Sequence, residues 1–460
     1  MLVTLGKIDH LDVLYDVLKA QEYWRLMDMS VDLVIVSEEA YSYALPLHTL
    51  ISDIVLAGQT RALTEIPKDI FLLDGNKIPP EDMALLHAVA RIIVNGNGAT
   101  LAEQMSMPLP AKLPSRMIAP EGVIDTPIPL RPYALLDANG LGGYNSDGNE
   151  YIIRLEPGQN TPAPWVNVIA NPSFGFIVSE AGSGYTWAEN SHENKLTPWS
   201  NDAVCDSPGE VIYLQDMDSD ALWTPTPMPI RENDPYAVRH GFGYTVFEHN
   251  SHGLEQELTQ FVPIDTQVKI GLLRLHNRTE RPRHLAVTYY VQPVLGVSPQ
   301  ETAMHIDSSA GNNGEMLLAN HYNENWVDKA ALVYMALENR SYTGDRKSFF
   351  GDGDMASPDG LRYPALSGEA GVALDPCAAI RGNLTLAPGE IRELVFLLGV
   401  ADLAANANAM ITRFGTPEGA REALAEVIRF WKAKINIVQV ETPSGSMMMQ
   451  QASTGKGATL

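Results

Sequence analysis

Two tryptophans, two asparagines and an aspartate gather in one short stretch of the chain. They are Trp187, Asn190, Trp199, Asn201 and Asp202. Indole faces stack on the C–H faces of a pyranose ring, while amides and carboxylates hydrogen-bond to neighbouring hydroxyl groups. We therefore predict that these five residues contact carbohydrate.

A structural role is the alternative for the two tryptophans. Trp187 and Trp199 could cap one end of a hydrophobic core, as buried aromatic residues commonly do. A core plug has no use for the amides of Asn190, Asn194 and Asn201, which stand around the indoles in the sequence. This density of amides favours contact with a sugar or with a neighbouring domain.

Arg239, Tyr244 and Glu248 form the second candidate set. Residues two apart on a strand share a face, so alternation places Tyr244 and Glu248 on the same side of the predicted strand. An arginine and a glutamate there could hold a saccharide, or could pair with each other and brace the rim of the sheet. Both interpretations are open from the sequence.

The sequence assigns no metal site, no cofactor and no catalytic residue. His249 and His252 are three residues apart after a predicted strand, without the helical i, i+4 spacing of a zinc pair. No G-x-S-x-G elbow occurs, and Cys205 and Cys377 stand in no catalytic motif.

Composition limits the partners and the compartment. The 460 residues carry a formal net charge of −24, which argues against nucleic acid or an anionic membrane surface as the main partner. Two distant cysteines favour a reducing compartment. We find neither a signal peptide nor an apolar run of about 18 residues, so we expect a cytoplasmic chain without direct membrane insertion.

Strands and helices alternate in residues 1–105, which predicts a small α/β module. Short β-branched runs are expected as strands at 2–5, 31–38 and 70–73, and the segment 79–96 as one helix that begins at a proline and ends at Gly96. The module has no glycine-rich phosphate loop, so we assign it no nucleotide.

The remaining chain is predicted to be mainly β. Residues 106–133 are proline-rich and read as a linker. Strand-length runs separated by turns fill 134–400, which predicts a large antiparallel β-sandwich. Residues 401–436 show helical periodicity and form a helical linker, and 437–460 are expected to be a disordered or aberrant tail.

Several of these segments closely resemble the cyclic β-1,2-glucan synthases, whose C-terminal part belongs to the glycosyltransferase 36 / glycoside hydrolase 94 phosphorylase-like family. The segments that carry the resemblance are NGLGGYNSDGNEYII (139–153), TPAPWVNVIANPSFGFIVSE (161–180), GYTWAENSHENKLTPWSND (184–202), RHGFGYTVFEH (239–249), LTQFVPID (258–265), SYTGDRKSFFG (341–351), LDPCAAI (374–380) and LAPGEIRELVFLLG (386–399). EYWRLMDMSVDLVIV (22–36) resembles the stretch that precedes the sandwich in the same synthases.

The resemblance implies a supersandwich that a linker helix joins to an α/α toroid carrying the general acid. We expect the toroid and the upstream glucosyltransferase module to be missing here, as in a truncated chain or one piece of a split gene. The implied partners are β-1,2-glucan or its oligosaccharides, or a separate chain that supplies the toroid. The parent synthase would lie at the inner membrane, with this region on the cytoplasmic side.

Three functions follow from these expectations. The first is carbohydrate binding and support for a glucan-processing catalytic domain, without turnover by this chain alone. The second is a scaffold or docking domain that has no glycan affinity of its own. The third is a decayed product without function.

Overall fold

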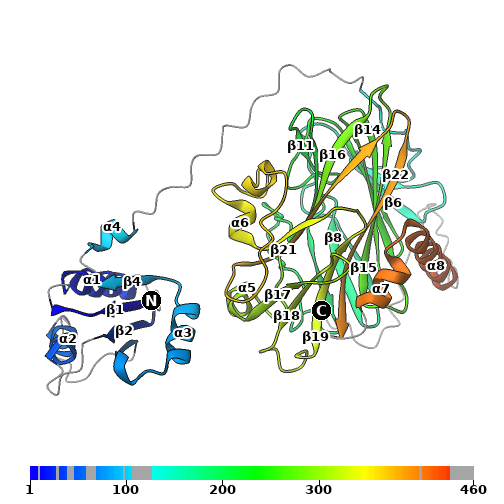
Figure 1. Cartoon of the computed structure of the whole chain (residues 1–460). Helices are drawn as coiled ribbons and strands as arrows, with labels where there is room; N and C mark the ends of the chain where they lie inside the picture. The colour runs from blue at the N-terminus through cyan, green and yellow to red at the C-terminus, as the bar shows by residue number, and fades with distance from the viewer. Residues whose placement is uncertain are drawn as a thin grey trace. The chain divides into compact units, whose positions relative to one another are not determined.

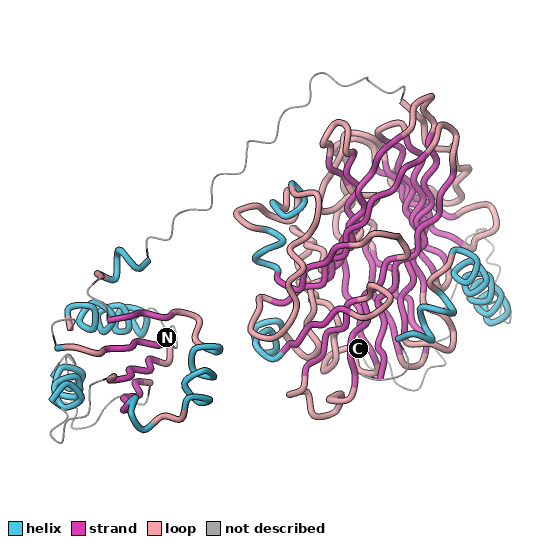
Figure 2. The backbone as a smooth tube through the Cα atoms, in the orientation of Figure 1, coloured by secondary structure: helices cyan, strands magenta, loops and turns pink. Residues whose placement is uncertain are grey.

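The computed structural model describes residues 1–8, 11–26, 31–38, 46–57, 69–96, 99–105, 127–402 and 407–435. Two compact units divide the chain, residues 1–115 and residues 116–460. Helices and strands alternate in the first unit, whereas strands dominate the second (Figures 1 and 2). Each unit is described by itself below.

A parallel four-stranded sheet forms the centre of the first unit. Its strands, in sheet order, are β3 (Ile70–Asp74), β2 (Leu33–Ser37), β1 (Leu2–Leu5) and β4 (Ile93–Gly96). The helices are α1 (Asp12–Leu26), α2 (Pro46–Ala57), α3 (Pro80–Val89) and α4 (Leu101–Met105). Buried side chains of α1 and α2 pack on one face of this sheet and make the core of the unit.

The predicted helix over 79–96 is wrong in its last part. Helix α3 ends at Val89, and Ile93–Gly96 instead forms β4, which pairs in parallel with β1. Ile92, Ile93 and Val94 are β-branched, and such residues favour a strand where a neighbouring strand offers a ladder. The sequence run continues apolar through both elements, so periodicity alone does not separate them.

Antiparallel sheets make up the second unit. The ten-stranded sheet contains, in sheet order, β17 (Ile306–Ala310), β18 (Met316–Asn320), β19 (Lys329–Met335), β22 (Ile391–Asp402), β15 (Val268–Asn277), β14 (Leu254–Phe261), β13 (Tyr244–Ser251), β12 (Tyr236–Gly241), β6 (Glu150–Leu155) and β5 (Gly142–Tyr144). The five-stranded sheet contains β11 (Leu222–Trp223), β10 (Glu210–Asp216), β16 (Arg283–Val291), β21 (Pro376–Leu386) and β20 (Ser341–Asp345). The three-stranded sheet contains β7 (Val166–Asn171), β8 (Phe174–Ser179) and β9 (Gly184–Ala188).

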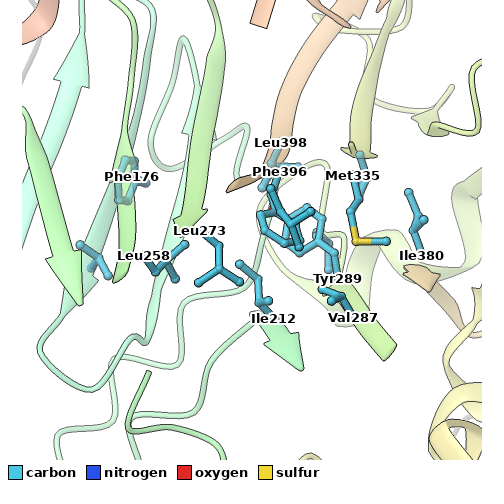
Figure 3. Packing of buried hydrophobic residues seen from close by; sticks show 14 of the residues in the cluster. Phe176, Ile212, Leu258, Leu273, Val287, Tyr289, Met335, Ile380, Phe396 and Leu398 are labelled. Carbon is cyan, nitrogen blue, oxygen red and sulfur yellow. The ribbon is translucent and has the colours of Figure 1, made fainter. Parts of the chain in front are cut away.

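The main core lies between the ten-stranded sheet and the two smaller sheets. Alternate residues of each strand point inward, so side chains of all three sheets meet in one buried cluster. Figure 3 shows part of it, with Phe176 of β8, Leu273 of β15, Tyr289 of β16 and Phe396 of β22. The predicted antiparallel β-sandwich is confirmed.

Short helices cover parts of the outer faces. Helices α7 (Ala407–Phe414) and α8 (Pro417–Ile435) bury Phe414, Ala423 and Val427 against β14, β15 and β22 of the ten-stranded sheet. Helix α6 (Arg346–Phe350) buries Phe349 on the outer face of the five-stranded sheet, and α5 (Pro299–Thr302) follows β16. The predicted helix at 417–435 thus has its counterpart in α8.

The domain boundaries of the sequence analysis stay predictions. Residues 106–126 of the proposed linker and the proposed tail at 437–460 lie outside the described residues. Residues 127–133 are described, and their side chains contact the sandwich: Leu130 is buried, while Arg131 and Tyr133 bond to Glu248.

Candidate functional site

The outer face of the three-stranded sheet carries the first candidate set. Inward residues of β8 join the main core, which leaves Gly175 and Ile177 on the opposite face. The strand register places Tyr185 beside Ile177 and Trp187 beside Gly175 on that face. Both aromatic side chains of β9 therefore point away from the core.

Three aromatic rings form a continuous cluster there. The Tyr185 ring stacks on Trp199, with centroids 5.1 Å apart and planes at 19°, and lies 5.3 Å from the Trp187 ring. The Trp187 indole covers Gly175, where a Cβ would lie 2.5 Å from indole atom Cζ2, so a side chain at this position would displace the indole. Trp199 is 46% exposed. Trp187 is partly exposed and Tyr185 is buried at 6% exposure, so the two indoles form the surface of this cluster.

The polar members of the first set shape the loop beside these rings. Asn190 Oδ1 accepts hydrogen bonds from the backbone N–H groups of His192 and Glu193, both at 2.9 Å. Asp202 Oδ1 accepts from the N–H groups of Cys205 and Val204, and these bonds hold the pKa of Asp202 below its usual value.

Asn201 extends this polar margin. It is exposed, with a φ of 47°, a left-handed conformation that asparagine tolerates better than most residues. Its amide makes no hydrogen bond with the part of the chain that the structure describes. A surface of stacked rings beside a polar loop can contact a ligand that is flat and apolar on its faces and polar at its edge.

The second candidate set lies in an ion-pair network on the ten-stranded sheet. Arg239 donates to Glu150 at 2.6 Å and to Glu248 at 3.0 Å, and only 14% of its side chain is exposed. Tyr244 donates its hydroxyl to Glu150 at 2.8 Å. Burial alone would lower the pKa of Arg239, but the attraction of Glu150 and Glu248 outweighs it and raises the pKa.

Segment 127–135 completes that network. Arg131 pairs with Glu248, and the Tyr133 hydroxyl donates to the same carboxylate at 2.5 Å. The structure therefore pairs Arg239 with Glu248, and Glu248 ties the segment to the sheet. A sugar contact at Arg239, Tyr244 or Glu248 stays a prediction.

The two candidate sets do not meet in one site. The aromatic cluster belongs to the three-stranded sheet and the ion pairs to the ten-stranded sheet. Among the described residues, no recorded hydrogen bond or ring contact joins Trp187 or Trp199 to Arg239 or Glu248.

The sequence analysis missed Tyr185 and the partners of Glu189. Tyr185 is two residues before Trp187 on a strand, so its place on the same face follows from alternation. Glu189 accepts hydrogen bonds from Trp326 Nε1 at 3.0 Å and from Gln267 Nε2 at 3.3 Å. Both partners are distant in sequence, so no local sequence pattern predicts them.

His249 and His252, considered for metal binding, share one carboxylate. The Nε2 atoms of both lie 2.7 Å from Glu232. Within the described ranges, no group of three or more His, Cys, Asp or Glu side chains is placed to hold a metal ion. In the same ranges no helix has the length and apolar character needed to span a bilayer.

Comparison with known proteins supplies the relatives. The chain is similar to the cyclic beta-(1,2)-glucan synthase NdvB of Rhizobium meliloti (strain 1021), with 32% identity over 450 residues, which cover 94% of this chain and 16% of the relative. It is also similar to the N,N'-diacetylchitobiose phosphorylase of Vibrio furnissii, with 26% identity over 314 residues, which cover 66% of this chain and 38% of the relative. The chain thus spans less than half the length of each.

Among solved structures, a bacterial glucoamylase complexed with acarbose matches 63% of this chain and 41% of its own. The identity is 9% and the TM-score 0.34, a likeness that does not bear on fold or function.

A family match completes the assignment. Residues 149–417 match the family described as the glycosyl hydrolase 94 supersandwich domain. The matched range begins one residue before β6 and ends at the first residue of α8, so it contains nearly all of the sandwich. The resemblance noted from the sequence is confirmed. Because the match covers more than half of the 460-residue chain, this protein belongs to the glycosyl hydrolase 94 supersandwich domain family.

Proposed function

We propose that this chain contributes a glucan-binding surface to a protein that processes β-1,2-glucan. The observation that carries the proposal is the pair of indoles, Trp187 and Trp199, which pack on the buried ring of Tyr185 beside the polar loop of Asn190 and Asp202. The similarity to a cyclic β-(1,2)-glucan synthase over 94% of the chain supports the choice of glucan.

The ligand chemistry follows from the surface. Aromatic faces attract the C–H faces of sugar rings, and amide or carboxylate groups at the margin can reach hydroxyl groups. A neutral glycan also suits a chain of net charge −24, because its binding needs no attraction between opposite charges.

We expect binding without turnover. No residue of this chain is assigned as a general acid, and the chain spans 16% of the synthase relative, so the catalytic work is proposed to lie in another part of that protein or in a partner chain. Incubation with linear β-1,2-glucan and phosphate should release no glucose 1-phosphate.

A tryptophan-fluorescence titration with linear β-1,2-glucooligosaccharides tests the binding proposal, with cellooligosaccharides as the linkage control. Trp199→Ala should weaken binding about tenfold, a change of about 1.4 kcal/mol, and should leave the melting temperature nearly unchanged because the indole is 46% exposed. Tyr363→Ala removes a similarly exposed ring on the loop that covers the five-stranded sheet, and should bind as the parent does. A well-folded parent that gives no saturable response would disprove glycan binding.

The second candidate is a docking surface for a catalytic domain. Val166 and Val168 of β7 are each 53% exposed, and Val168 shares the outer face of the sheet with Tyr185. Apolar side chains gathered at a surface are typical of protein interfaces. A folded sample that does not bind glycans but binds a separate α/α catalytic domain would favour this candidate.

The cytoplasmic location of the chain stays a prediction.

A further inference from the structure

A small recess opens beside the loop that joins β18 and β19. Its volume is about 20 Å³, and its lining includes the polar residues Asn194, Asn323 and Lys329 together with Trp326 and Leu295. A volume of this size holds one group as large as a water molecule. The recess can therefore seat a single hydroxyl group, but not a whole sugar ring.

Two asparagines, Asn194 and Asn323, line this recess. Asn194 is 4% exposed, and its Nδ2 donates to the carbonyl of Ala188 at 3.0 Å. Asn323 Nδ2 donates to the carbonyl of Leu295 at 3.2 Å. With both amide nitrogens bonded, the described residues offer no donor to either Oδ1 atom. An acceptor without a donor favours a ligand that brings a hydroxyl group.

One aromatic residue, Trp326, lines the recess. Trp326 Nε1 donates to Glu189 Oε2, which orients the indole. A ring beside a hydroxyl-sized recess provides both contacts that a sugar unit needs: a face for its C–H groups and acceptors for its edge.

Lys329, which lines the recess, and Glu189, which bonds to Trp326, are already paired, and this argues for a neutral ligand. Lys329 Nζ donates to Asp402, and Glu189 accepts from Trp326 and Gln267. An ionic ligand would find no free charge of either sign in these contacts.

The recess borders the aromatic cluster in sequence and in space. Glu189 and Asn194 belong to the loop that follows Trp187, and Lys195 of that loop bridges to both Trp187 and Gly296. A glucan chain longer than one or two units could therefore reach both surfaces.

We propose that the recess beside Trp326 is a second contact point for the same neutral glucan, in which one hydroxyl enters the recess while its sugar ring lies on the indole. This inference rests on the proposed function, because it takes the ligand class from there.

Calorimetric titration of the full chain with linear β-1,2-glucooligosaccharides of increasing length tests it. Trp326→Ala should weaken the binding of long oligomers about tenfold, equivalent to about 1.4 kcal/mol, and should leave the shortest bound oligomer unaffected. Trp326→Phe keeps a ring but loses the bond to Glu189, and should retain most of the affinity. Tyr363→Ala serves as the control for an exposed ring elsewhere.

Each outcome separates this inference from the proposed function. If Trp199→Ala weakens binding but Trp326→Ala matches the parent at every length, the second contact point is wrong and the proposed function stands. If the parent binds no oligomer, both fail. If Trp326→Ala melts early, Asn323→Ala takes its place, because Asn323 lines the recess and is partly exposed, and parental affinity for long oligomers in this variant overturns the inference.

Discussion

His240 on β12 is held as a neutral imidazole by its neighbours. Its Nε2 lies 3.1 Å from the carbonyl of Trp165 and must donate, so Nδ1 accepts from the Thr245 hydroxyl at 3.0 Å. Desolvation lowers the pKa of His240 to about 4, although the bond to Trp165 opposes this change. The unfolded chain, with a histidine pKa near 6.5, takes up a proton more readily than the native chain.

The stability of the sandwich should therefore fall as the pH drops from about 6.5 to about 4. The contribution of neutral His240 is complete above pH 6.5, and its loss amounts to on the order of 2–3 kcal/mol by pH 4. Urea unfolding at pH 7, 5.5 and 4 measures it. His240→Gln should flatten the pH dependence, and His192→Gln removes an exposed imidazole as the control. Equal slopes for the parent and His240→Gln would contradict the assignment.

At the scale of single residues, local chemistry was predictable and distant pairing was not. The aromatic and amide character around Trp187 is visible in the sequence, and alternation along β9 sets the face. Arg239 pairs with Glu248, and both side chains also pair with a distant partner: Arg239 with Glu150, and Glu248 with Arg131. These partners are about a hundred residues away, so no spacing rule connects them.

Among the elements, α8 depends on a glycine in the β12–β13 turn. Gly243 has a φ of 82°, and a Cβ there would lie 2.3 Å from Trp431 Cδ1 and 2.9 Å from Val427 Cγ1. Helix α8 can approach the sheet only because this turn carries no side chain. Gly389, in the β21–β22 turn, has a φ of 73° and no neighbour within 4 Å of such a Cβ.

Gly243→Ala should destabilise the protein more than Gly389→Ala. Both substitutions place alanine in a left-handed conformation, which costs about 1–2 kcal/mol. Only Gly243→Ala also displaces the Trp431 side chain. The free energy of unfolding in urea measures the difference between the variants. Quenching of tryptophan fluorescence by acrylamide reports whether Trp431 becomes accessible. Identical losses in the two variants would show that α8 does not rest on this turn.

Element types were predicted better than element limits. The strands of the sandwich follow from alternating runs between turns, and α8 from its apolar stripe. The boundary between α3 and β4 was missed because an apolar β-branched run fits a helix or a buried strand equally well. Pairing with β1 decides it, and that pairing is a tertiary contact.

At the scale of the whole molecule, the core of residues 1–115 and the main core of the sandwich share no residue. Val3, Leu14 and Ile35 belong to the core of residues 1–115, whereas Phe247 and Leu273 belong to the main core of the sandwich. The change from parallel to antiparallel sheets was predictable from helix–strand alternation followed by closely spaced strands. The distribution of the strands over three sheets was not predictable from the sequence, because strand order depends on contacts between distant residues.

Separate cores predict separate unfolding transitions in differential scanning calorimetry of the full chain. Leu14→Ala removes a fully buried side chain from α1 and should lower the free energy of unfolding of residues 1–115 by about 2–5 kcal/mol. The melting temperature of that transition should fall accordingly. Phe247→Ala should lower the free energy of unfolding of the sandwich by about 3–5 kcal/mol and leave the transition of residues 1–115 unchanged. The smaller unit has fewer residues, so we assign it the transition with the smaller enthalpy. A single transition that both variants shift equally would mean that the two cores unfold as one cooperative unit.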